Sequence, residues 1–157
     1  MNVLHPPFVH FVIALPLAAL FSQLTYLKTA DRTYSKAAIR IMVLASLVSF
    51  FAIFSGLIDA GKIIQNQNIL KSGLPLLDHH KVFGFVVVFI LLITTLTKWL
   101  ALSKNSLTLE KLSLSLIILS ISVSLYQGNK GGSIVYKYSG GVDTQIIMNR
   151  VSENNTK

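Results

Sequence analysis

The chain alternates between long apolar segments and short polar ones. A helix needs about 20 apolar residues to cross a bilayer core of ~30 Å. Four segments meet this length, namely residues 8–27, 38–60, 80–102 and 107–127. We therefore predict an all-α integral membrane bundle of four transmembrane helices, residues 1–142. A polar C-terminal tail, residues 143–157, follows it.

A glycine-rich stretch with the sequence NKGGSIVYKYSGGVD, residues 129–143, comes after the fourth segment. Its glycines interrupt the helical pattern, and the run SIVYKY favours a β-strand. We expect a short glycine-rich C-terminal extension here, folded as a small hairpin or as a lid over the end of the bundle.

The composition supports a membrane location. Hydrophobic residues make up 52% of the chain and charged residues only 13%, against about 25% charged residues in a soluble domain. The net charge of +8 comes from basic residues at the ends of the apolar segments, which is typical of membrane topology rather than of nucleic-acid binding. The absence of cysteine excludes disulfides and the covalent attachment of c-type haem.

The basic residues also orient the bundle. The two short connections carry seven of them, Lys28, Arg32, Lys36, Arg40, Lys98, Lys104 and Lys111. The opposite face carries seven as well, but spread over a long loop and a long tail. Because the density of basic residues near helix ends sets topology, we expect the short connections in the cytoplasm. Both termini then face the periplasm of a bacterium, and the chain is a multi-pass protein of the inner membrane.

Two of the predicted helices carry stripes of small residues. In the second segment these residues are spaced four, three and four apart, at Ala45, Ser49, Ala52 and Gly56. In the fourth segment one face carries Ser113, Ser120 and Ser124 and continues to Gln127. Such a stripe lets a second helix or a flat ligand approach closely.

The four histidines lie where the first and third segments begin, so the topology brings them to one membrane face. An ionisable side chain at the entrance to a membrane helix indicates a functional site. We predict that His10 and His80 face each other across the bundle. Small residues lie one turn beyond each of them, Ala14 after His10 and Gly84 after His80, and they leave a slot between the two helices.

Two neutral imidazoles on facing helices, beside such a slot, are the arrangement that binds a b-type haem in a bundle. We therefore predict His10 and His80 as axial ligands, with Gly84 leaving room for the macrocycle. His5 precedes two prolines and His79 is one step shallower than His80, so these two are alternates outside the site.

Two further side chains at this face could assist. Asp59, in the motif GLIDAG, would orient a ligand histidine through its second ring nitrogen, or would pair with Lys62 or Lys81. The Tyr136 phenol would donate a hydrogen bond to a carboxylate of the cofactor. Tyrosine is also an ordinary anchor at the membrane interface.

Two other interpretations of the histidines stay open. A mononuclear metal site could draw on the histidines and Asp59, although imidazole suits several metals and does not select one. Alternatively, the histidines cap helices and bind water at the interface, and no cofactor is present.

Several motifs resemble those of bacterial membrane proteins grouped as domain of unknown function 2231. They are HPPFVHF, SGLIDAG, a histidine that opens the third helix, and GGSIVYKYSGGV. The resemblance implies a four-helix inner-membrane protein, sometimes joined to Rieske-type or cytochrome domains. The resemblance also implies that the residues at the family's motif positions matter in this chain. These residues are His5, His10, Asp59, His80, Gly131, Gly132, Tyr136 and Gly141. Val12 replaces a proline of the family pattern, and Tyr138 replaces a frequent histidine.

These observations predict a haem-b-binding membrane subunit that transfers electrons, with the quinone pool or a redox domain as its partner. The alternatives are a cofactor-free structural or assembly subunit of a larger membrane complex and a mononuclear metal-binding protein. The sequence carries no motif that is typical of a hydrolase or a transferase.

Overall fold

The computed structural model describes residues 4–155. Four long helices form a bundle: α1 His5–Thr29, α2 Arg32–Gln65, α3 Leu74–Ser103 and α4 Leu107–Tyr138. A single 3₁₀ turn, η1 Lys71–Gly73, precedes α3, and a shorter helix, α5 Thr144–Asn155, follows α4. No strand occurs between residues 4 and 155. The all-α prediction is confirmed, and all four long helices are long and apolar enough to cross a membrane.

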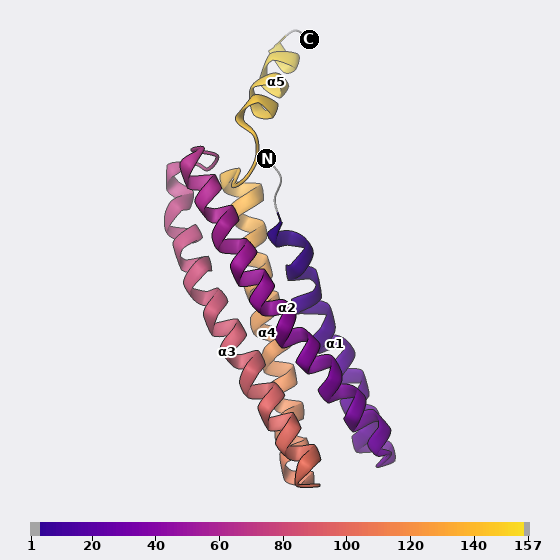
Figure 1. Cartoon of the computed structure of the whole chain (residues 1–157). Helices are drawn as coiled ribbons and strands as arrows, with labels where there is room; N and C mark the ends of the chain where they lie inside the picture. Colours follow the sequence, from indigo (N-terminus) through magenta and orange to yellow (C-terminus); the bar gives the residue numbers. More distant parts are fainter. Residues whose placement is uncertain (1–3, 156–157) are drawn as a thin grey trace.

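The helices run alternately up and down, so that the start of α1 and the end of α4 lie at the same end of the bundle (Figure 1). Each helix packs against two others, in the cyclic order α1, α2, α3, α4. The diagonal pairs, α1 with α3 and α2 with α4, bring no Cα atoms within 8 Å of each other. Side chains that meet along a diagonal therefore cross the interior of the bundle. The end that carries His5 and His80 is called the histidine end, and the opposite end the Glu110 end.

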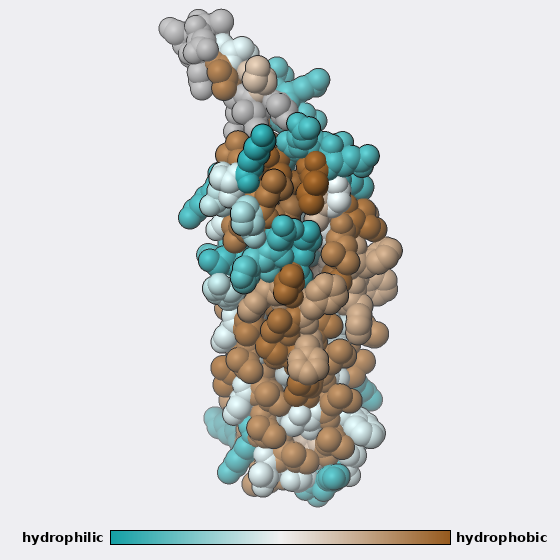
Figure 2. Space-filling view, turned by 90° about the vertical axis from the view of Figure 1, so that its left-hand side faces the viewer, coloured by the Kyte–Doolittle hydropathy of each residue, from teal (hydrophilic) through white to brown (hydrophobic). Residues whose placement is uncertain are grey.

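Apolar side chains cover the outside of the bundle. Figure 2 shows hydrophobic residues over most of its surface, with hydrophilic ones concentrated towards the end from which α5 projects. Large exposed side chains include Phe21, Phe50, Phe54, Phe89 and Trp99. Because a soluble protein does not expose so large an apolar surface, this surface faces the lipid bilayer.

The interior is correspondingly rich in small and polar residues. The predicted stripe on α2 is buried at Ala45, Ser49 and Ala52, and the predicted stripe on α4 is buried at Ser113, Ser120 and Ser124. Small residues let neighbouring helices approach closely, and hydroxyl groups bond between helices or back to their own carbonyls. Both stripes were predicted from their spacing, and both face the core.

The glycine-rich stretch differs from the prediction of a hairpin or lid. Residues 129–138 continue α4 as helix, and the polar tail contains helix α5. The physical reason is close packing: a Cβ atom on Gly131 would lie 3.1 Å from the His80 ring, and one on Gly128 would lie 3.1 Å from Ile13. These glycines admit neighbouring side chains, and the resulting tertiary contacts outweigh the weak helix propensity of glycine.

Helix α2 begins with an aspartate cap in the first connection. An Asp31 carboxylate oxygen accepts a hydrogen bond from the backbone N–H of Thr33 at 2.8 Å. This bond to the Thr33 backbone, with a second from the Thr33 side chain, lowers the pKa of the Asp31 carboxyl below its ordinary value of 3.8. A lowered pKa means that the carboxylate stabilises the fold above that ordinary value and loses its contribution as the pH falls through the folded-state pKa.

We expect Asp31→Ala to lower the melting temperature at pH 7, because the cap satisfies an otherwise unpaired N–H at the helix start. The difference in melting temperature between Asp31→Ala and the wild type should vanish as the pH falls below the folded-state pKa of Asp31. Asp31→Asn is the matched control, since asparagine caps without titrating. Thermal unfolding of the three proteins across this pH range checks the prediction, and a difference that persists unchanged in acid would contradict it.

Candidate functional site

The first residues of α1 are held by a carboxylate from α2. One oxygen of Asp59 accepts hydrogen bonds from the backbone N–H groups of Leu4 and His5, both at 2.8 Å. The helix has no side-chain cap of its own, and a negative group at a helix N-terminus is stabilising. Asp59 thus fixes the backbone of His5 rather than a histidine ring. The Lys62 ammonium lies 4.0 Å from its other oxygen, and Lys81 pairs instead with Asp78 at 2.6 Å.

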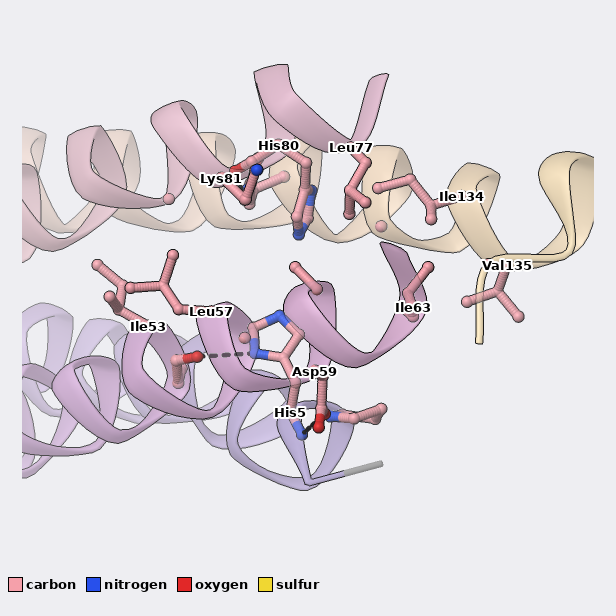
Figure 3. A pocket seen from close by; sticks show the side chains of 18 of the residues that line it. His5, Ile53, Leu57, Asp59, Ile63, Leu77, His80, Lys81, Ile134 and Val135 are labelled. Carbon is pink, nitrogen blue, oxygen red and sulfur yellow. Dashed lines mark hydrogen bonds between the residues drawn. The ribbon is translucent and has the colours of Figure 1, made fainter. Parts of the chain in front are cut away.

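The His5 ring is positioned by α2 as well. Its Nδ1 lies 2.8 Å from the carbonyl oxygen of Ala52. A carbonyl only accepts, so Nδ1 carries the proton in this bond and Nε2 presents a lone pair. The ring lies against Gly56, where a Cβ atom would come within 2.9 Å of Nδ1. The His5 imidazole therefore packs on α2 at Ala52 and Gly56, two members of its small-residue stripe. Figure 3 shows the labelled His5 ring beside this helix.

The His80 ring reaches towards His5 from α3. The two ring centroids lie 6.1 Å apart and the ring planes are nearly perpendicular, at 88°. The His80 ring packs on Gly131, and its backbone carbonyl accepts a hydrogen bond from Gln127 at 2.7 Å. Its Nδ1 is buried and has no hydrogen-bond partner. Two imidazoles from diagonally placed helices therefore meet inside the bundle (Figure 3).

Both imidazoles line a cleft of about 130 Å³ at the histidine end. Its walls are mainly apolar side chains of α2, α3 and α4, including Ile53, Leu57, Ile63, Leu77 and Ile134. Gly84 and Asp59 line it as well, and so does Lys81, whose ammonium pairs with Asp78. A smaller cavity of about 60 Å³ continues from the two histidines into the bundle.

His10 does not lie inside the bundle opposite His80, as the sequence predicted. It is exposed on the outside of α1, its Nδ1 lies 2.7 Å from the Pro6 carbonyl, and Ala14 is exposed on the same side. The reason is the helical period of 3.6 residues. The buried face of α1 contains Val12 and Ala19, and His5 lies seven residues before Val12, two turns away on that face. The expectation that His10 and His80 face each other is wrong, because His5 holds that place.

The other predicted residues lie outside the cleft. His79 is exposed and lines another hollow, between α3 and α4, which His80 and Gln127 also line. Tyr136 is 90% exposed on the surface of α4, so its phenol does not point into the cleft. Within residues 4–155 no three histidine, aspartate or glutamate side chains converge to hold a metal ion.

A second polar site lies at the Glu110 end and was not predicted from the sequence. Lys98 was counted among the basic residues of the short connections, yet it and Glu110 are both buried, with 0% and 2% exposure. Their side chains form a salt bridge. The available signal was the position of Lys98 well inside the apolar segment 80–102, because a lysine within a membrane helix requires a partner. Without Lys98, the positive-inside argument rests on six basic residues in the short connections rather than seven.

The contact between His5 and Gly56 gives a testable prediction. We expect Gly56→Ala to displace the His5 ring and break its bond to Ala52, whereas a Cβ atom on Gly61 would meet nothing within 4 Å. Alanine is favoured over glycine in a helix by about 1 kcal/mol. Gly61→Ala should therefore raise the unfolding midpoint in detergent, and Gly56→Ala should not. Equal stabilisation by the two substitutions would contradict the packing of the His5 ring against Gly56.

The fold and this site define a class, that of four-helix integral membrane proteins with a pair of histidines inside one end of the bundle. Within it, the chain belongs to the family described as "Predicted membrane protein (DUF2231)", which matches residues 2–144. This match confirms the family that the sequence motifs indicated. No curated protein and no solved structure matches the chain significantly.

Proposed function

We propose that this protein is a haem-b-binding membrane subunit that transfers electrons, with His5 and His80 as the axial ligands of the iron. The observation that carries the proposal is the meeting of these two imidazoles inside an apolar cleft. The ligand pair differs from the sequence-based prediction in one member, because His5 replaces His10.

The separation of the rings supports a shared metal. With metal–nitrogen bonds of about 2.1 Å, and a ring centroid roughly 1.1 Å behind the nitrogen, two imidazoles on opposite sides of one metal have centroids roughly 6.4 Å apart. The centroids of His5 and His80 lie 6.1 Å apart. The centroid separation of the pair is therefore close to that of two imidazoles that share one metal.

The number of ligands favours haem over a bare ion. A structural zinc site takes four protein ligands and a catalytic one takes three, while the cleft offers two imidazoles. A haem brings four ring nitrogens of its own, so two histidines complete its coordination. When bound, the iron supplies one-electron chemistry.

The residues around the rings have supporting roles in this proposal. The Ala52 carbonyl holds the proton of His5 on Nδ1 and leaves Nε2 for the metal. Asp59 anchors the backbone of His5 from α2. Lys81, which lines the cleft, and Lys62 beside Asp59 would pair with the carboxylates of the cofactor.

The proposal extends to location. The basic residues of the short connections favour a cytoplasmic Glu110 end, so the histidine end faces the periplasm of a bacterium and the protein lies in the inner membrane. Electrons would pass there between the quinone pool, or a redox domain, and the periplasm. A reporter that is active only in the cytoplasm, fused after the tail, tests the orientation, since the proposal requires it to stay silent.

The size of the cleft favours a second candidate, a cofactor-free structural or assembly subunit of a larger membrane complex. Ligand pockets usually measure about 300–1,000 Å³, and this cleft measures about 130 Å³. The two rings also fill the space over Gly56 and Gly131. For haem to enter, exposed side chains at the edge of the cleft, such as Leu57 and Phe85, must turn towards the lipid.

Absorption spectra of the purified protein, oxidised and then reduced with dithionite, distinguish the two candidates. After expression with ample haem, we expect a Soret band and, on reduction, the sharp α band of six-coordinate haem b. A protein that is folded and lacks a Soret band would overturn the haem proposal in favour of the structural subunit.

A further inference from the structure

Polar side chains follow one another through the interior of the bundle, from the Glu110 end to the cleft. At the Glu110 end they form a fully connected cluster. Lys98 bonds to Glu110 and, at 2.7 Å, to the hydroxyl of Ser35, which in turn donates to Glu110 at 2.7 Å. The Gln23 amide also donates to the Glu110 carboxylate, at 2.8 Å. An ion pair buried in a membrane bundle often marks an ion or proton path.

The next polar groups lie at regular intervals between α3 and α4. Thr94 is four residues from Lys98, one turn or ~6 Å along α3, and its hydroxyl is 2.9 Å from that of Ser120. Ser124 is a further turn of ~6 Å along α4, and Gln127 follows about 4.5 Å beyond it. One water bonded to two groups spans roughly 5.6 Å, since each such bond is about 2.8 Å long. The rise between successive polar residues from Ser120 to Gln127 is therefore about the span of one bridging water. Glu110 lies ten residues before Ser120, or ~15 Å along α4, so the path between the pair and Ser120 needs more than one water.

Unpartnered buried atoms mark where such waters would bind. Gln23 Oε1, Ser124 Oγ and Gln127 Oε1 are buried without a hydrogen-bond partner, although buried polar atoms are normally satisfied. Ser124 is only 3% exposed. Together with Gln127 it lines the cavity of about 60 Å³ that reaches the two histidines, and a water needs only about 10–15 Å³ of such space.

Hydrogen bonding between helices explains the paired groups but not these atoms. If the polar residues served only to join helices, each would be expected to have a protein partner, as Thr94 and Ser120 do. Instead, the unpartnered oxygens lie along the same line, at the Glu110 end and beside the cavity.

From this line of groups we infer that the bundle contains a water-bridged path that conducts protons between the Glu110–Lys98 pair and the cleft at the histidine end. At each hop, one O–H bond breaks as the next forms, and no oxidant or reductant takes part. The path is independent of haem binding. If haem is bound, the path connects the cleft with protons from the opposite membrane face.

Proton flux into vesicles tests the path. The full-length protein is reconstituted into phospholipid vesicles that contain a pH-sensitive dye, and a potassium gradient with valinomycin drives proton entry. We expect the wild type to acidify the vesicles faster than protein-free vesicles do. Ser124→Val and Ser120→Val remove hydroxyl groups of the path. Vesicles with either variant should acidify no faster than protein-free vesicles. Ser122→Val is the matched control, because Ser122 lies on the exposed face of α4.

A second variant tests the entry of the path without leaving a buried charge. Lys98→Met combined with Glu110→Gln removes both ionisable groups and should also abolish the flux. Circular dichroism and elution volume confirm that each variant is folded, and any that is not is replaced by its alanine counterpart. Wild-type flux equal to that of protein-free vesicles, or equal flux in all the variants, overturns the inference. The assay contains no redox reagent, so its result is separate from that of the absorption spectra.

Discussion

Replacement of Glu110 with alanine, with Lys98 left in place, is expected to destabilise the protein by about 3–5 kcal/mol, because it leaves a buried charge without a partner. Lys98 has no exposed surface, and its only other hydrogen-bond partner among the described residues is the Ser35 hydroxyl. The Gln23 amide would lose one of its acceptors as well. Thermal and denaturant unfolding in one detergent, followed by circular dichroism, measures the loss.

The double variant Lys98→Met with Glu110→Gln is the control for this prediction. Replacing both members of a buried ion pair is often neutral or even stabilising, and glutamine can still bond to Gln23 and Ser35. We therefore expect the double variant to unfold close to the wild type. A single Glu110→Ala variant as stable as the wild type, or a double variant as unstable as the single one, would show that the pair does not hold this end of the bundle together.

Loss of bound haem is the second large effect that we expect, in His5→Ala and in His80→Ala. Each substitution removes one of the two imidazoles that meet in the cleft, and an iron with one axial protein ligand is held more weakly. His10→Ala and His79→Ala should retain the haem content of the wild type, because both side chains are exposed away from the cleft. Haem per protein, measured after purification under identical conditions, gives the comparison.

The four variants are matched, since each removes one imidazole from the same end of the bundle. If His10→Ala loses haem and His5→Ala keeps it, the assignment of ligands in this structure is wrong and the sequence-based pair was right. If all four variants keep their haem, the cofactor binds elsewhere. Either result would leave the fold unaffected.

Most of the fold could be predicted from the sequence, because it follows from hydropathy. Four apolar segments of membrane-spanning length, with short connections, imply an antiparallel bundle. The spacing of Ala45, Ser49 and Ala52 identified a face that is indeed buried. The end of α4 could not be predicted in this way, since its glycines weaken the local helical signal while the packing of Gly131 on the distant His80 decides the structure.

Two histidines meet at the end of the bundle where the sequence predicted them to meet, but the histidine from α1 is His5 and not His10. Which histidine faces inward depends on where α1 begins, and this helix begins at His5, with prolines in its first turn, rather than at Phe8. The start of α1 is fixed by the hydrogen bond that the Asp59 carboxylate accepts from the backbone N–H of His5. The two residues lie 54 positions apart in the sequence. A seven-residue spacing from His5 to Val12 and on to Ala19 was the one local signal of the buried face.

The most direct test of the central claim, that two imidazoles ligate one haem iron, is the low-temperature electron paramagnetic resonance spectrum of the oxidised wild-type protein. This measurement reports the spin state of the iron and the relative orientation of its axial imidazoles. Because the rings of His5 and His80 are nearly perpendicular, at 88°, we predict a low-spin ferric signal with strongly anisotropic g values. A high-spin signal from the wild type, or no haem signal after expression with ample haem, would contradict it.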